Sequence, residues 1–258
     1  MVATSRTDKP FSLSSFLISD GPAGFLLSWV AGFVDTSAFI ILFGVFTAHV
    51  TGNIALAGSS FVSSDTETTI TRLLMLPIFM VTVMLTSLLA RYARYKKWCV
   101  FGVLLTTEAI ALVVLWIVGT QLSPSLILDV QEEYIFPIAM SGVVAMAIQN
   151  ALMKEAKGVF KSYIPTTVMT GNTTQLSIDL VQTIVSKFLP DGKQEGAEAI
   201  ERMSRGVPVI AGFALGGLAA AYFVLVSETW WSLIFPVVII SILAIAAYVD
   251  HYRASSNA

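Results

Sequence analysis

The stretch Gly44-Val45-Phe46-Thr47-Ala48-His49-Val50-Thr51-Gly52-Asn53 decides the fold, because both of its glycine tripeptides recur later in the chain. Gly158-Val159-Phe160 and Thr170-Gly171-Asn172 repeat the Gly-Val-Phe and Thr-Gly-Asn elements in the same order. A polar residue lies nine positions before each Gly-Val-Phe, Asp35 in the first half and Gln149 in the second. Two ordered pairs of tripeptides are improbable by chance at average residue usage, so the sequence predicts a duplicated unit.

The composition places this unit in a membrane. The chain has 258 residues, of which 55% are hydrophobic and 12% are charged, whereas a soluble domain carries about 25% charged residues. The sequence therefore predicts an integral membrane protein whose main contact is the lipid bilayer. A net charge of −2 does not fit a nucleic-acid binder. One cysteine and two histidines provide neither a disulfide nor a metal-ligand cluster, so we expect no metal and no cofactor.

Six segments are long and apolar enough to cross a bilayer core, which takes about 20 helical residues. These predicted spans are 21–46, 73–90, 98–120, 134–153, 207–226 and 230–249. Two further apolar stretches, about 47–62 and 166–189, are shorter or more polar, and each contains one copy of Thr-Gly-Asn. These two stretches are predicted to dip into the membrane and return, or to lie along its surface.

The distribution of Lys and Arg predicts the orientation, because these residues accumulate in cytoplasmic loops. Six spans with a cytoplasmic N-terminus leave only Arg72 of the fifteen Lys and Arg residues on the outside. Eight spans would move the basic cluster at 91–97 outside. Each half then holds three spans, an odd number, so the second half is inverted relative to the first, as in many transporters.

The predicted fold is thus an all-α integral membrane protein with six transmembrane helices. They form two inverted three-helix repeats, each with a re-entrant or interfacial Thr-Gly-Asn segment. The predicted organisation is a cytoplasmic tail at 1–20, a first repeat at 21–120, an external loop at 121–133, a second repeat at 134–250 with a cytoplasmic connector at 190–206, and a cytoplasmic tail at 251–258.

The repeated motif is the first candidate site. Thr51-Gly52-Asn53 and Thr170-Gly171-Asn172 each resemble a break followed by a new helix, in which Thr or Asn caps the first N–H groups and Gly frees the turn. Such a helix start presents donors and partial positive charge to a polar or anionic substrate. The alternative is a cap that also packs closely against a neighbour. Two copies in opposite orientations favour a substrate site.

Asp35 is the second candidate, because it lies within the first predicted span. A carboxylate there costs about 2.5 to 3.5 kcal/mol on insertion scales, so it should face the protein interior and have a partner. It could carry a proton, bind a cation or contact the substrate. Alternatively, it accepts hydrogen bonds from Thr51 or Asn53 and pins the re-entrant segment. Gln149 and Asn150, at the matching place in span four, are uncharged candidates for substrate binding.

Two more titratable residues are candidates for proton or ion coupling. Glu108 lies near the centre of span three. It either joins a proton path with Asp35 or is a neutral carboxylic acid hydrogen-bonded to a neighbouring helix. His49 lies two residues before Thr51 and could titrate together with Asp35. The alternative for His49 is a hydrated side chain near the membrane interface.

These motifs resemble the signature of the YoaK family of small bacterial integral membrane proteins. The resemblance rests on Gly32-Phe33-Val34-Asp35, on residues 46–53, and on Gln149-Asn150 followed by residues 167–172. It covers nearly the whole chain. It implies a multi-pass protein of the bacterial inner membrane, with both termini in the cytoplasm as the charge pattern predicts. It supplies no substrate, because the family is known as a domain of unknown function.

The leading functional hypothesis is a small secondary transporter or permease-like protein for an unidentified small polar or anionic solute, with proton coupling as one option. The alternative is a non-transporting membrane subunit for assembly or regulation. An intramembrane enzyme is the weakest hypothesis, since no Ser/His/Asp set can be assembled from the sequence. Six short spans leave little room for a closed pathway in one subunit, which makes a homodimer plausible.

Overall fold

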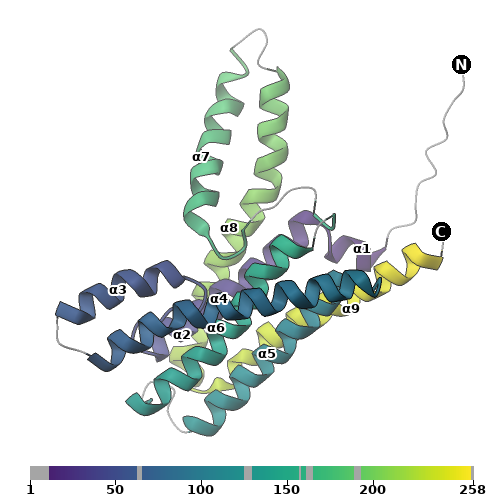
Figure 1. The fold of residues 1–258 in the computed structure, drawn as a ribbon. Coiled ribbons are helices and arrows are strands. Elements are labelled where there is room, and N and C mark those ends of the chain that lie inside the picture. Colours follow the sequence, from purple (N-terminus) through teal and green to yellow (C-terminus); the bar gives the residue numbers. More distant parts are fainter. Residues whose placement is uncertain are drawn as a thin grey trace, which may run out of the picture.

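The computed structural model describes residues 12–62, 66–124, 130–156, 158–160, 165–188 and 193–256 (Figure 1). The ends of both predicted tails, the middle of the predicted external loop and the first residues of the predicted connector lie outside these ranges. Every regular element in the described ranges is a helix. The helices are α1 (Leu13–Leu17), α2 (Asp20–Ile41), α3 (Val50–Val62), α4 (Thr66–Tyr95), α5 (Val100–Leu122), α6 (Glu132–Glu155), α7 (Met169–Val185), α8 (Lys193–Ser227), η1 (Trp230–Leu233) and α9 (Ile234–Ser256).

The prediction of six membrane spans is confirmed by helix length and composition. The six candidates are α2, α4, α5, α6, α8 and the continuous stretch Trp230–Ser256. Several boundaries differ from the predicted ones. Helix α8 begins at Lys193, so most of the predicted connector is the first part of the helix that continues into span five. Short α1 lies within the predicted N-terminal tail and packs against α9.

The first span ends at Ile41, five residues earlier than predicted, because the chain turns there. Phe43 and Gly44 both have a positive φ, of 50° and 83°. The Gly44 N–H donates to the Phe39 carbonyl at 2.9 Å. This hydrogen bond between residues five positions apart is typical of helix C-termini that end at a left-handed residue. Gly158, the first residue of the second Gly-Val-Phe, has a φ of 85°. Both glycines of the repeated tripeptide thus adopt a left-handed conformation that glycine tolerates without steric cost.

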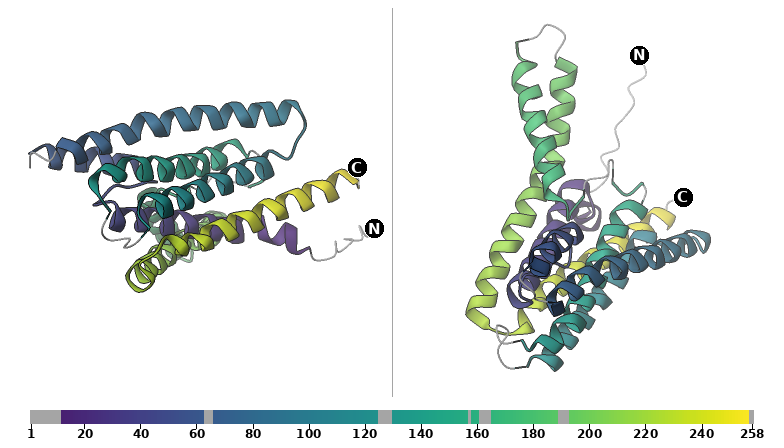
Figure 2. Two further views of the ribbon diagram at one scale, coloured as in Figure 1. Left: turned by 90° about the horizontal axis from the view of Figure 1, so that it is seen from below. Right: turned by 60° about the vertical axis from the view of Figure 1, so that its left-hand side comes forward.

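The helices form a bundle around α2 and α6, the two most buried spans. Helix α8 packs along α2, α4 packs along α6, and α5 lies against both α6 and α9. Helix α3 packs on α4, and α7 packs on α8. The hairpin of α7 and the first part of α8 projects from the bundle (Figures 1 and 2).

The contact between α2 and α8 depends on glycines that let the two backbones touch. A Cβ at Gly212 would lie 2.3 Å from the Phe25 carbonyl oxygen, and a Cβ at Gly216 would lie 2.1 Å from that of Trp29. From the other side, a Cβ at Gly32 would lie 2.2 Å from the carbonyl oxygen of Phe213. Small residues at such spacing are the usual means of close helix packing in membranes.

We expect Gly212→Ala to destabilise the protein by about 1 to 3 kcal/mol, because the new methyl group overlaps a backbone atom that cannot move independently. Gly206→Ala is the matched control on the same helix, since a Cβ there meets nothing within 4 Å. That control should be neutral or stabilising by up to about 1 kcal/mol, the helix preference of alanine over glycine. Thermal unfolding in detergent micelles measures both, and equal effects would contradict the packing argument.

Candidate functional site

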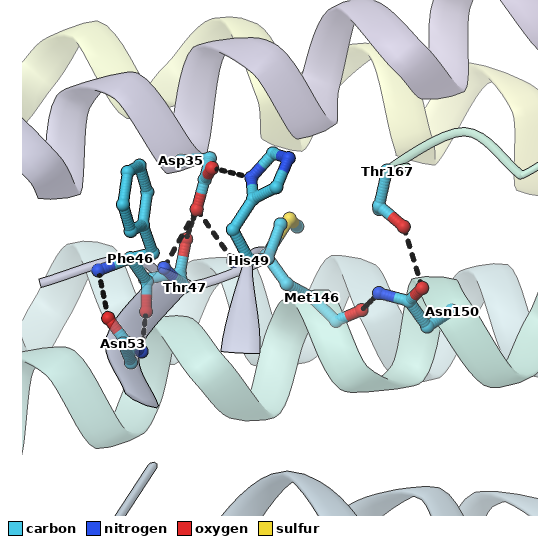
Figure 3. A network of polar contacts seen from close by, with 9 residues as sticks. Asp35, Phe46, Thr47, His49, Asn53, Met146, Asn150 and Thr167 are labelled. Atoms are coloured by element: carbon cyan, nitrogen blue, oxygen red, sulfur yellow. Dashed lines mark hydrogen bonds and ion pairs between the residues drawn. The ribbon is translucent and has the colours of Figure 1, made fainter. Parts of the chain in front are cut away.

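The carboxylate of Asp35 holds the chain that leaves α2. Its Oδ1 accepts hydrogen bonds from the backbone N–H groups of Thr47 at 2.8 Å and Ala48 at 2.6 Å, and from the Thr47 hydroxyl at 3.2 Å (Figure 3). Its Oδ2 pairs with Nδ1 of His49. Asp35 is 2% exposed, so the expected buried position and partner are both present. The prediction that Thr51 or Asn53 donates to Asp35 is wrong, because the partners of the carboxylate are Thr47, Ala48 and His49.

His49 connects this buried carboxylate to the surface of the bundle. The His49 side chain is 32% exposed, whereas that of Asp35 is 3% exposed. The imidazole packs edge-on between the rings of Phe46 and Phe213, at centroid distances of 5.5 and 5.7 Å. The hydrogen bond to Asp35 raises the pKa of His49 above 6.5; burial opposes this shift, and the charge of Asp35 adds to it. Of the two side chains in the pair, only that of His49 is accessible at the surface of the bundle.

Asn53 closes the same loop with both atoms of its amide. Its Oδ1 accepts from the Phe46 N–H at 2.8 Å, and its Nδ2 donates to the Phe46 carbonyl at 2.7 Å (Figure 3). The sequence predicted a helix cap here, but the side chain of Asn53 instead satisfies the peptide groups of a residue seven positions earlier. Gly52 lies against the Phe46 ring, where a Cβ would come within 2.9 Å of Cδ2. Thr51 is exposed.

The second half has a related arrangement built on amides. The fully buried Gln149 donates through Nε2 to the Leu27 carbonyl at 2.7 Å and to the Thr166 hydroxyl at 3.0 Å. Asn150 accepts from the Thr167 hydroxyl at 2.6 Å and donates to the Met146 carbonyl at 2.9 Å (Figure 3). Thus Gln149 and Asn150 bind the segment before α7, much as Asp35 binds the segment before α3.

The second Thr-Gly-Asn copy keeps only part of the first one's bonding. Asn172 donates through Nδ2 to the Pro165 carbonyl at 2.6 Å, again seven residues earlier. Thr170 and Gly171 are exposed. The importance of Thr47, Ala48, Thr166 and Thr167 was missed, and the available signal was their fixed place six and five residues before each motif asparagine.

Glu108 stays apart from both clusters. It is 0% exposed on α5, and neither carboxylate oxygen has a hydrogen-bond partner among the described residues. It makes no hydrogen bond to Asp35 or His49 there, so a proton path that joins these groups stays a prediction. The described residues contain no group of three or more His, Cys, Asp or Glu side chains that could hold a metal ion.

The chain belongs to the family described as a protein of unknown function (DUF1275), which it matches over residues 23–246. The match runs from the start of α2 to the last span and includes both clusters. No curated protein and no solved structure matches the chain.

We expect the stability of the protein to depend on pH through His49. Because its pKa is raised in the folded state, the pair with Asp35 contributes fully below the usual value of 6.5 and is lost as the pH rises through the raised value. The melting temperature of wild type should therefore exceed that of His49→Gln most at about pH 5.5 and least at about pH 9. A difference that does not change with pH would contradict this role.

Alanine substitutions of the two motif asparagines should differ in cost. Asn53→Ala removes two hydrogen bonds and leaves both peptide groups of Phe46 unpaired, whereas Asn172→Ala removes one bond. At about 0.5 to 1.5 kcal/mol per bond, Asn53→Ala should cost about twice as much free energy of unfolding. Thermal or denaturant unfolding in micelles gives the comparison, and a larger loss for Asn172→Ala would contradict it.

Proposed function

We propose that this chain is a small secondary transporter for a polar solute in the bacterial inner membrane, with Asp35 and His49 as its proton-coupling pair. The observation that carries the proposal is the position of this pair. A carboxylate buried within the span bundle is joined to a partly exposed imidazole at a break between two helices. Intramembrane acids with titratable partners mark proton and substrate pathways.

The proposal includes two inverted three-helix repeats, each with a re-entrant or interfacial Thr-Gly-Asn segment, and several observations support it. The left-handed glycines Gly44 and Gly158 begin corresponding segments. The seven-residue spacing from asparagine to its partner is the same in both halves. If α2 corresponds to α6 and α8 to α4, the close contacts of α2 with α8 and of α6 with α4 are equivalent pairs. Non-helical backbone at membrane depth is tolerated where it lies within protein, and Leu42, Val45, Thr47 and Ala48 of this segment are buried, whereas Phe43 is exposed.

The remaining parts of the proposal follow from the sequence. The YoaK resemblance agrees with the assigned family and suggests the bacterial inner membrane. The charge pattern favours cytoplasmic termini, and a homodimer would provide additional surface for a pathway. No enzymatic activity is proposed.

A second candidate, a non-transporting membrane subunit, is favoured by one observation. In the first half, both oxygens of Asp35 and both amide atoms of Asn53 are bonded within the chain. When all of its polar atoms are hydrogen-bonded within the chain, a motif can bind a solute or a proton only if some of these bonds break; otherwise its role is structural. The two candidates therefore differ in whether Asp35 changes its partners during function.

We expect Asp35→Asn to abolish proton-coupled transport while the protein still folds, because the amide keeps an acceptor oxygen but cannot bind a proton. A thermal-shift screen of small organic ions at two pH values identifies solutes, and proteoliposomes with an internal pH dye then report solute-driven proton movement. Glu132→Gln, an exposed carboxylate at the start of α6, is the control and should leave transport unchanged.

Solute-driven proton movement that survives in Asp35→Asn would contradict the coupling role. If no solute shifts the melting temperature and Asp35→Asn is only less stable than wild type, the subunit hypothesis replaces transport.

A further inference from the structure

The hydrogen bonds of the two motif asparagines differ at a single backbone atom of the partner residue. In the first copy the Phe46 N–H donates to Asn53 Oδ1, so this oxygen is satisfied. In the second copy the residue seven positions before the asparagine is Pro165, which has no N–H to donate. Asn172 is only 8% exposed, and its Oδ1 accepts no hydrogen bond from any described residue. The oxygen itself is not sealed from water, because it is absent from the buried, unpaired polar atoms of the described residues. A ligand with a donor would therefore replace water at this oxygen.

This unpaired oxygen belongs to a residue that lines a cavity between α7 and α8. The cavity has a volume of about 600 Å³, within the range of small-molecule sites. Gly171 and Asn172 line it from α7, and Met203 lines it from α8. Pro165 and Leu176 add apolar surface. Because Nδ2 of Asn172 is held by Pro165, its oxygen is the amide atom left for a ligand.

The charges around the cavity do not favour an anion. Arg202 binds Asp179 through Nε at 2.9 Å and Nη2 at 2.8 Å, and also binds Gln182. Arg205 lies 3.6 Å from Glu201 and 3.9 Å from Asp20. Both guanidinium groups are therefore already engaged by carboxylates.

The sum of charges points the same way. Three carboxylates line the cavity, from Asp179, Glu198 and Glu201, against the two arginines, which leaves a net charge of −1. The N-terminus of α7 adds roughly half a positive charge and does not reverse this sign. The lining therefore suits a cation that carries N–H donors and a short apolar part.

We propose that this cavity binds a primary organic ammonium ion, with Asn172 Oδ1 accepting one of its N–H groups. Its assignment as the transported solute rests on the proposed transport function, whereas binding itself does not. The second Thr-Gly-Asn copy would then recognise the solute, because its partner residue is a proline.

The test measures binding of n-butylammonium to the full-length protein in lipid nanodiscs by ligand-observed saturation-transfer NMR. n-Butyltrimethylammonium has the same charge without an N–H donor, and n-butyrate has the opposite charge. Wild type should bind butylammonium at least tenfold more tightly than either, a difference of about 1.4 kcal/mol per factor of ten. Butyrate binding as tightly as butylammonium would overturn the proposal, as would equal binding of the quaternary ion.

Pro165→Ala tests the mechanism, because it restores an N–H that can bond to Asn172 Oδ1 as Phe46 does to Asn53. Butylammonium should bind about tenfold more weakly, while binding of the quaternary ion and the melting temperature without ligand should not fall. Unchanged butylammonium binding in this variant overturns the role of Asn172. If Pro165→Ala does not fold, the comparison of the three probes on wild type decides alone.

The result is separable from that of the transport assay. Selective butylammonium binding without proton-coupled transport supports the site and contradicts the transporter. Coupled transport of another solute, without butylammonium binding, contradicts the site and leaves the transporter.

Discussion

The hydrogen bonds from the backbone of residues 47 and 48 to the Asp35 carboxylate are the interaction on which the first half of the structure depends. The chain leaves the helical conformation at Leu42 and resumes it only at Val50. Within an apolar bundle, each unpaired N–H or carbonyl group in that interval would cost several kcal/mol. Asp35 accepts the N–H groups of two residues, and Asn53 satisfies both peptide groups of a third. Two side chains thus satisfy the peptide groups of three residues in an irregular segment between two helices.

Close packing by glycines gives this segment its place. On α6, a Cβ at Gly142 would lie 2.6 Å from Cγ2 of Thr47, so the loop can lie against α6 only because position 142 has no side chain. Similarly, Gly32 lets α2 approach the backbone of α8 at Phe213, whose ring contacts His49. The loop that Asp35 holds is therefore packed through glycines against two neighbouring helices, by a side-chain contact at Gly142 and a backbone contact at Gly32.

Much of this arrangement could be predicted from the sequence, because apolar length and a charge inside a span are local signals. They predicted the six spans and a buried, partnered Asp35. The actual donors could not be predicted, since backbone N–H groups of Thr47 and Ala48 leave no mark on residue type. The early end of α2 depends on left-handed backbone at Phe43 and Gly44, and Phe43 is not a residue that predicts it. The role of Asn53 was mistaken because a side-chain amide that pairs with a peptide seven residues back looks, in sequence, like a helix cap.

Under the proposed inverted repeat, two single-residue differences assign proton exchange to the first half and ligand recognition to the second. Asp35 corresponds to Gln149, so only the first half can exchange a proton at the group that holds its loop. The residue seven positions before the motif asparagine is Phe46 in the first half and Pro165 in the second, so only the second half keeps an unpaired oxygen on its motif asparagine. The half that can titrate has no free recognition atom, and the half with a free recognition atom cannot titrate.

Coupling would therefore have to pass between the halves, and α2 provides a direct route. It carries Asp35 in its C-terminal half, and at Leu27 and Ser28 it contacts Gln149 and the Thr166 carbonyl of the second cluster. A shift of α2 that follows protonation at Asp35 would thus be felt at the segment that positions Asn172.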